Sequence, residues 1–180
     1  MTTYIAFLRG INVGGHRVTM DVLRRLFTEL GLSNVRTYIQ SGNVFFETEE
    51  QNRAQLTARI EQHLQQTLGY RVSVFLRSVA ELEQLLTLNP FGHLAVTNDM
   101  RLCVMFLAEP APVGLELPLF SPKADMEIVS LTDQEAFVVW YIIEGRPPAS
   151  MTFLDKTLGR QTTTRFFHTA AKILEAAKKS

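Results

Sequence analysis

The residues best equipped to bind a ligand lie directly after the first apolar segment of the chain. Arg9 and Arg17 carry positive charge, Asn12 carries an amide, and His16 carries an imidazole. The glycines among them, which let backbone N–H groups approach a ligand closely, are Gly10, Gly14 and Gly15. A basic, glycine-rich loop that leads into a helix is typical of sites that hold phosphate or another anion. This stretch therefore predicts a cradle for a small anionic or phosphate-containing ligand.

The elements around this loop follow the order strand, helix, strand, strand, helix, strand. Apolar runs and alternating patterns predict strands at 4–8, 35–39, 43–47 and 71–77. Apolar residues recur at helical spacing after the loop, where Thr19 is a suitable N-cap, and again after Thr48, which opens a T-x-x-Q capping box. Glycines close both helices. This order is that of the ferredoxin-like, or split βαβ, arrangement.

A second polar loop is expected beside the first. In the ferredoxin-like order the first and third strands are antiparallel neighbours, so the end of one lies beside the start of the other. Arg9 and Gly10 should then lie next to Ser41, Gly42 and Asn43. Ser41 and Asn43 would add hydrogen-bonding groups to the anion cradle.

A structural interpretation of the glycine-rich loop is also open. Paired glycines suit the positive φ angles of a type I′ turn, so residues 11–18 could form a hairpin with Gly14 and Gly15 at its tip. The glycine spacing does not match the G-x-G-x-x-G dinucleotide fingerprint, and no Gly-Lys-Ser/Thr of a P-loop is present. The two interpretations are compatible, because a hairpin can itself present the polar side chains.

Residues 78–180 predict a second, smaller α+β half. A capping box begins a helix at Ser78, strands are expected at 102–107, 126–131 and 136–143, and helices are expected at 150–158 and 164–179. The whole chain is therefore expected to be an α+β protein. We expect residues 1–77 to form the ferredoxin-like half, packed on a second half of residues 78–180 in one compact unit.

Thr164 and Arg165 are the candidate site residues of this second half. They end a run of three threonines that is expected at a helix start, where one hydroxyl caps the helix. A further hydroxyl and the guanidinium could donate to one anion. A plain surface role for both residues remains equally open.

Patterns typical of catalysis or metal binding are missing from the sequence. The histidines are scattered, no H-E-x-x-H motif occurs, and Ser41 lies outside a G-x-S-x-G elbow. Cys103, the single cysteine, lies in an apolar segment and is expected in the core. We therefore predict no metal site and no cofactor, and we assign no reaction. His16 is the one candidate for an acid or base.

Composition limits the expected partners and location. Eighteen basic and eighteen acidic residues cancel, so no overall field favours nucleic acid. Phe7 and Phe45 should share one sheet face and could stack bases, but Lys and Arg do not accompany them, so nucleic-acid binding ranks last. The longest apolar run, 136–143, is too short to cross a membrane, and a single cysteine fits a reducing compartment. We expect a cytoplasmic protein.

Two signatures resemble a known bacterial family. Y-I-A-F-L-R-G-I-N-V-G-G at 4–15 and V-R-T-Y-I-Q-S-G-N-V-F-F at 35–46 are similar to the family called domain of unknown function 1697. The resemblance implies an α+β fold with a ferredoxin-like N-terminal part, and it implies no reaction. The family pattern T-R-N-W-x-T is matched at 164–169 except that Phe166 and Phe167 replace Asn and Trp.

The leading hypothesis is a binding protein for a small anionic ligand at the two loops. The alternative is an interaction module, in which the loops stabilise the join between the halves or a homodimer and no small ligand exists. Single-stranded nucleic-acid binding is third.

Overall fold

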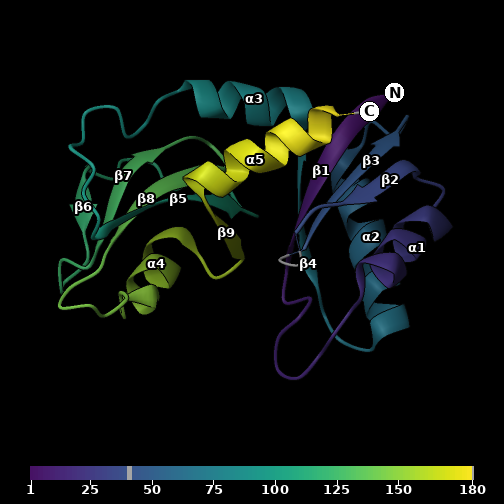
Figure 1. Ribbon diagram of the computed structural model, residues 1–180, viewed down its shortest axis with the longest axis horizontal. Helices are drawn as coiled ribbons and strands as arrows, with labels where there is room; N and C mark the ends of the chain where they lie inside the picture. Colours follow the sequence, from purple (N-terminus) through teal and green to yellow (C-terminus); the bar gives the residue numbers. More distant parts are fainter. Residues whose placement is uncertain (40–41, 180) are drawn as a thin grey trace. The chain divides into compact units, whose positions relative to one another are not determined.

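The computed structural model describes residues 1–39 and 42–179, which divide into two compact units. The first unit comprises Met1–Leu86 together with Ile173–Ser180, and the second comprises Thr87–Lys172. Each unit contains one antiparallel sheet and helices, and α5 (Phe167–Lys178) contributes residues to both units (Figure 1). The chain is therefore an α+β protein, as the sequence predicts.

The first unit has the ferredoxin-like order. Its elements are β1 (Thr2–Arg9), α1 (Met20–Glu29), β2 (Ser33–Thr37), β3 (Asn43–Thr48), α2 (Arg53–Leu68), β4 (Ser73–Ser78) and α3 (Val79–Thr87). The strands lie in the order β2-β3-β1-β4, and each neighbouring pair is antiparallel. This is the strand order that the split βαβ arrangement produces.

The core of the first unit lies between the sheet and the helices α1 and α2 (Figure 1). Alternate residues of each strand face these helices, among them Ala6 and Leu8 of β1 and Val44 and Phe46 of β3. Phe45, one residue out of phase, lies on the other face, as the alternation predicts.

Local capping signals fix where the helices begin. Thr19 caps α1, its hydroxyl accepting the N–H of Val22 at 3.2 Å. The predicted capping box of α3 is confirmed, because Glu81 accepts the N–H of Ser78 at 2.8 Å while the Ser78 hydroxyl accepts the N–H of Glu81 at 3.1 Å. The predicted start of α2 at Thr48 is wrong: Asn52 is the N-cap, and its side chain accepts from Gln55 at 3.1 Å.

The end of α5 (Phe167–Lys178) is held in the first unit by Arg36 of β2. Its guanidinium donates to the carbonyls of Ala176 at 3.1 Å and Ala177 at 3.0 Å, and also to that of Lys179. It also lies 5.3 Å from the ring centre of Phe45. The last carbonyls of a helix lack partners within it, so a cation there satisfies them and complements the helix dipole.

Replacing Arg36 by alanine is expected to free the last turn of α5. We expect amide hydrogen exchange to rise over residues 173–179 and the free energy of unfolding to fall by about 1–3 kcal/mol, because carbonyls lose charged donors. Arg36→Lys should give an intermediate result, since an ammonium keeps the charge but not the planar fork. Unchanged exchange in Arg36→Ala would show that the helix end does not depend on this contact.

The second unit is built on a five-stranded sheet in the order β6-β7-β8-β5-β9. Its elements are β5 (Met100–Leu107), β6 (Leu119–Phe120), β7 (Met126–Leu131), β8 (Glu135–Tyr141), α4 (Met151–Leu158) and β9 (Thr162–Phe166), followed by the first part of α5. The strands predicted at 126–131 and 136–143 are confirmed as β7 and β8, which pair with each other, and the predicted helix α4 is confirmed.

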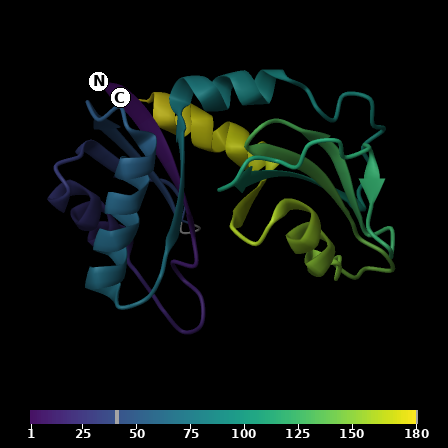
Figure 2. The same ribbon diagram turned by 180° about the vertical axis from the view of Figure 1, so that it is seen from behind.

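Both faces of the second sheet are covered within the unit. Leu154 and Leu158 of α4 pack on Cys103 and its neighbours, on one face of the sheet. Both views show α4 below this sheet (Figures 1 and 2). On the other face the ring of Phe137 meets those of Phe91 and Phe167 edge-on, at centroid distances of 6.0 and 6.3 Å. Cys103 is a core residue, as predicted.

The predicted helix at 164–179 begins too early. Residues Thr162–Phe166 form β9, which pairs with β5, and the helix starts at Phe167. Threonine serves both as a helix cap and as a strand residue, and here pairing with β5 decides between the two roles. Of the helices in the described part of the chain, none is long and apolar enough to cross a membrane.

Candidate functional site

The glycine-rich loop joins β1 to α1 and turns sharply at both ends. Arg9 is exposed at the end of β1, and Gly10 follows with a φ of +84°. Ile11 turns inward and is buried in the first core. The loop thus leaves the sheet through a backbone conformation that favours glycine and is fastened to the core one residue later.

The tip of the loop is a tight turn over Val13–His16. The N–H of His16 donates to the carbonyl of Val13 at 3.1 Å, and Gly14 and Gly15 have φ angles of +61° and +86°. Two consecutive positive φ values are what a type I′ turn requires. The predicted turn is therefore confirmed.

The arms of this turn do not form the predicted hairpin ladder. No residue of 11–18 belongs to a strand. Instead the side-chain oxygen of Asn12 accepts the N–H of Val18 at 2.8 Å and closes the loop from within. An asparagine that replaces a backbone partner in this way is a common device of irregular loops.

Gly42, directly before β3, lies against the end of β1 and the start of the first loop, as the topology predicts. The N–H of Leu8 donates to the carbonyl of Gly42 at 2.8 Å. A β-carbon on Gly42 would lie 3.0 Å from side-chain atoms of both Leu8 and Ile11. Gly42 therefore permits the close approach of the two loops.

Asn43 has a structural place in this second loop. Its side chain is fully buried, and its amide donates to the carbonyl of Tyr38 at 3.0 Å. The N–H of Tyr38 donates in turn to the Asn43 carbonyl at 3.0 Å. Ser41, the other predicted site residue here, lies outside the described residues.

A hollow of about 260 Å³ opens where the loop enters α1. It is lined by Asn12, Arg17, Val18, Thr19 and Met20. It therefore combines a guanidinium and an amide with the N-terminus of a ten-residue helix, where backbone N–H groups lack helical partners and the dipole is positive.

Tyr70 holds the loop through two contacts, one with the ring of His16 and one with the backbone of Ile11. Their rings stack with centroids 3.8 Å apart and planes 17° from parallel. The Tyr70 hydroxyl donates to the carbonyl of Ile11 at 2.7 Å, and burial raises the pKa of this tyrosine. Sequence reasoning missed Tyr70. The available signal was an aromatic residue directly after Gly69, the glycine that ends α2.

The second unit contains the other predicted site residues. Thr164 lies within β9, and Arg165 is 8% exposed. The guanidinium of Arg165 donates to the hydroxyl of Thr163 and the carbonyl of Thr164, both at 2.9 Å, and burial lowers its pKa to about 10. Both residues therefore belong to the sheet of the second unit, and their predicted place at a helix start is wrong. Their contact with an anion stays a prediction.

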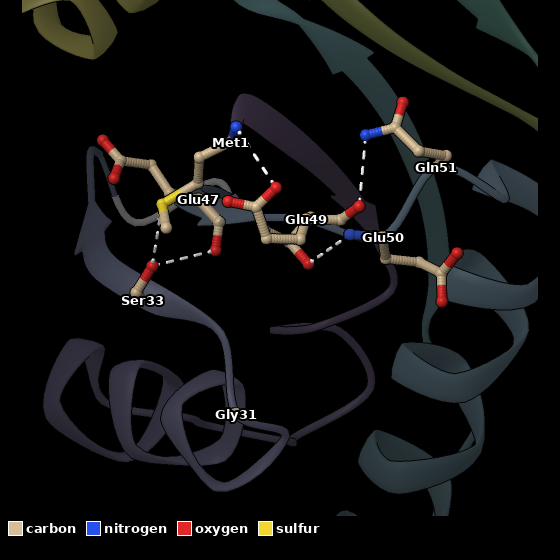
Figure 3. A pocket seen from close by; sticks show the side chains of 8 residues that line it. Met1, Gly31, Ser33, Glu47, Glu49, Glu50 and Gln51 are labelled. Atoms are coloured by element: carbon tan, nitrogen blue, oxygen red, sulfur yellow. Dashed lines mark hydrogen bonds and ion pairs between the residues drawn. The ribbon is translucent and has the colours of Figure 1, made fainter.

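A larger hollow in the first unit, of about 720 Å³, is bordered by three carboxylates that already have partners. They belong to Glu47, Glu49 and Glu50 (Figure 3). Glu47 accepts from Asn34 at 3.0 Å, Glu50 accepts the Asn52 N–H at 2.7 Å, and Glu49 pairs with the amino terminus at 3.4 Å. Figure 3 shows the carboxylates of Glu47 and Glu50 on opposite sides of this hollow. They do not converge on one point.

The described residues include no cluster suited to a metal ion, and the two rings expected to stack on bases are buried. Across residues 1–39 and 42–179, no group of three or more His, Cys, Asp or Glu side chains is placed to hold a metal ion. Phe7 and Phe45 are 0% and 2% exposed, so neither ring is presented for stacking on a base.

A solved structure shows the same fold, and a family model shows the family. No curated protein matches the chain. A solved structure of a conserved bacterial protein from Streptococcus pneumoniae is similar, with 26% sequence identity, a TM-score of 0.69 and 99% of each chain covered. The family model described as "Protein of unknown function (DUF1697)" matches residues 1–137, which include the whole glycine-rich loop. The chain belongs to this family, DUF1697.

Proposed function

We propose that the chain binds a small anion, or the anionic group of a small molecule, in the hollow at the start of α1. The observation that carries the proposal is the lining of this hollow by Arg17 and Asn12 at a helix N-terminus. Helix N-termini favour negative charge because their N–H groups and dipole both point at it.

The charge of the loop supports the proposal. Residues 9–20 contain two arginines, Arg9 and Arg17, and no acidic residue. The first acidic side chain that follows, Asp21, is paired with Arg24 one turn further along α1. An anion at the hollow would therefore meet a locally positive surface in a protein of zero net charge.

The volume of the hollow limits the ligand. About 260 Å³ is below the usual range for sites that enclose drug-sized molecules. The hollow suits one phosphate, sulfate or carboxylate group with a small organic part. We therefore propose inorganic phosphate and small phosphate monoesters as the first ligands to test.

Exposed apolar side chains keep the interaction module as a second candidate. Val13 at the tip of the first loop is 59% exposed, and Ile39 before the second loop is 46% exposed. Apolar side chains at two neighbouring loops can form the centre of a protein contact. A homodimer of this kind would appear as a concentration-dependent change of mass in sedimentation.

Substitution of Arg17 tests the proposed function. We expect Arg17→Ala to weaken binding of phosphate or glucose 6-phosphate by about ten-fold or more, because the loss of a charge-assisted hydrogen bond costs about 1.5–3 kcal/mol. Titration calorimetry at constant ionic strength measures the change directly.

The matched control is Arg146→Ala, which removes an exposed arginine from the second unit. This variant should bind as the wild type does. If the wild type binds neither ligand, or if both variants lose affinity equally, the anion proposal fails. A gel shift with single-stranded RNA at low salt tests the third hypothesis in the same preparation.

A further inference from the structure

We infer that His16 is a positioning residue of the anion site, and that it acts by stacking on Tyr70 rather than by touching the ligand. The inference rests on the proposed function, because it explains how the loop around the hollow keeps its shape. It also assigns a role to Tyr70, which lies 54 positions further along the chain than His16.

Tyr70 is itself firmly placed. It follows Gly69, which ends α2 in the left-handed conformation with a φ of +82°. The ring of Tyr70 is half-buried against the core of the first unit. The tyrosine is therefore attached to the helix and the core, and it is not part of the loop that it contacts.

The loop is attached to Tyr70 at two points. The phenol hydroxyl donates to the Ile11 carbonyl at 2.7 Å, and the ring lies 3.8 Å from that of His16. Between these points lie Asn12 and the two glycines of the turn. Glycines allow many backbone conformations, so an unattached loop of this composition would lose much entropy on ordering. Attachment at both ends reduces that loss.

The two attachment points adjoin two of the polar residues that line the hollow, Asn12 and Arg17. Asn12 follows Ile11, and Arg17 follows His16. Fixing the backbone at residues 11 and 16 therefore also fixes the backbone positions from which the side chains of Asn12 and Arg17 extend. If the loop is already ordered before the anion binds, binding loses less conformational entropy, and the affinity is higher.

Face-to-face stacking determines which substitutions should be tolerated. The contact with Tyr70 is made through the flat face of the imidazole, with the ring centroids 3.8 Å apart. A phenyl ring can make the same contact but carries no charge and no N–H group. His16→Phe thus separates a stacking role from a ligand-binding role.

The experiment compares His16→Phe, His16→Ala and Tyr70→Phe with the wild type, using inorganic phosphate as the ligand. We measure its affinity by calorimetry and the amide hydrogen exchange of residues 11–18. His16→Phe should bind phosphate within about two-fold of wild type and keep slow exchange. His16→Ala and Tyr70→Phe should bind about five- to ten-fold more weakly and exchange faster. His93→Ala, which removes an exposed histidine of the second unit, should change neither quantity.

The outcomes separate this inference from the proposed function. If His16→Phe loses as much affinity as His16→Ala, His16 contacts the anion itself and the inference is overturned. Unchanged exchange in His16→Ala and Tyr70→Phe overturns it as well. If wild type binds no phosphate, the proposed function fails for this ligand, while faster exchange in these two variants still supports the attachment of the loop.

Discussion

Replacing Gly42 by alanine is expected to lower the free energy of unfolding by about 2–5 kcal/mol. Its φ of +85° costs an L-residue about 1–2 kcal/mol. The added methyl group would also lie 3.0 Å from atoms of both Leu8 and Ile11, and overpacking typically costs about 1–3 kcal/mol. Urea unfolding followed by far-UV circular dichroism measures the loss.

Gly14→Ala is the matched control for this prediction. Gly14 has a φ of +61°, but no atom lies within 4 Å of where its β-carbon would be. Only the backbone cost applies, so we expect a loss of about 1–2 kcal/mol. Equal losses in the two variants would show that the approach of the second loop to Leu8 and Ile11 contributes nothing.

The approach of these two loops was predictable because topology alone requires it. Once the order of strands and helices is known, the ferredoxin-like arrangement places the end of β1 beside the start of β3. The observed register pairs Phe7 with Asn43, two residues from Arg9. Local signals were enough, because apolar runs, alternating patterns and helical spacing identify the strands and helices between residues 2 and 78.

The roles of individual loop side chains were not predictable in this way. The sequence predicts Asn12 and Asn43 as ligand-binding residues, but it does not predict the hydrogen bonds that the structure gives them: the side-chain oxygen of Asn12 accepts from Val18, and the amide of Asn43 donates to Tyr38. An asparagine side chain can satisfy either partner, and only the three-dimensional path of the loop decides. The stack of His16 on Tyr70 is equally non-local, since no sequence period relates the two positions.

The misplaced helix start at Thr164 has a related cause. A run of threonines suits a cap and a strand alike, and the sequence around it gives no alternation to decide. Pairing of Thr162–Phe166 with β5 settles the matter through contacts with residues about sixty positions away. Arg165 consequently becomes a buried sheet residue.

Asp125→Asn is expected to destabilise the second unit by about 2–3 kcal/mol near neutral pH. Asp125 is 5% exposed, and its carboxylate accepts the Ser121 hydroxyl at 2.6 Å and the Ala149 N–H at 2.9 Å. Burial alone would raise its pKa, but these hydrogen bonds lower the pKa to about 2. The NH₂ group of an asparagine here would face either the Ser121 hydroxyl or the Ala149 N–H. That buried donor would then have no acceptor.

The pH dependence of this effect follows from the lowered pKa. The folded protein holds the carboxylate ionised down to about pH 2, whereas an unfolded aspartate titrates near pH 3.9. The stabilisation is therefore complete above about pH 5 and is lost as the pH falls toward 2, at about 1.4 kcal/mol per unit of pKa difference. The unfolding free energies of wild type and Asp125→Asn should converge over that range.

Trp140, the single tryptophan, lies in β8 and reports unfolding of this unit by fluorescence. Asp133→Asn, at an exposed turn, is the control and should be as stable as wild type near neutral pH. A wild-type advantage over Asp125→Asn that persists unchanged at pH 2 would contradict the assignment of the low pKa to Asp125.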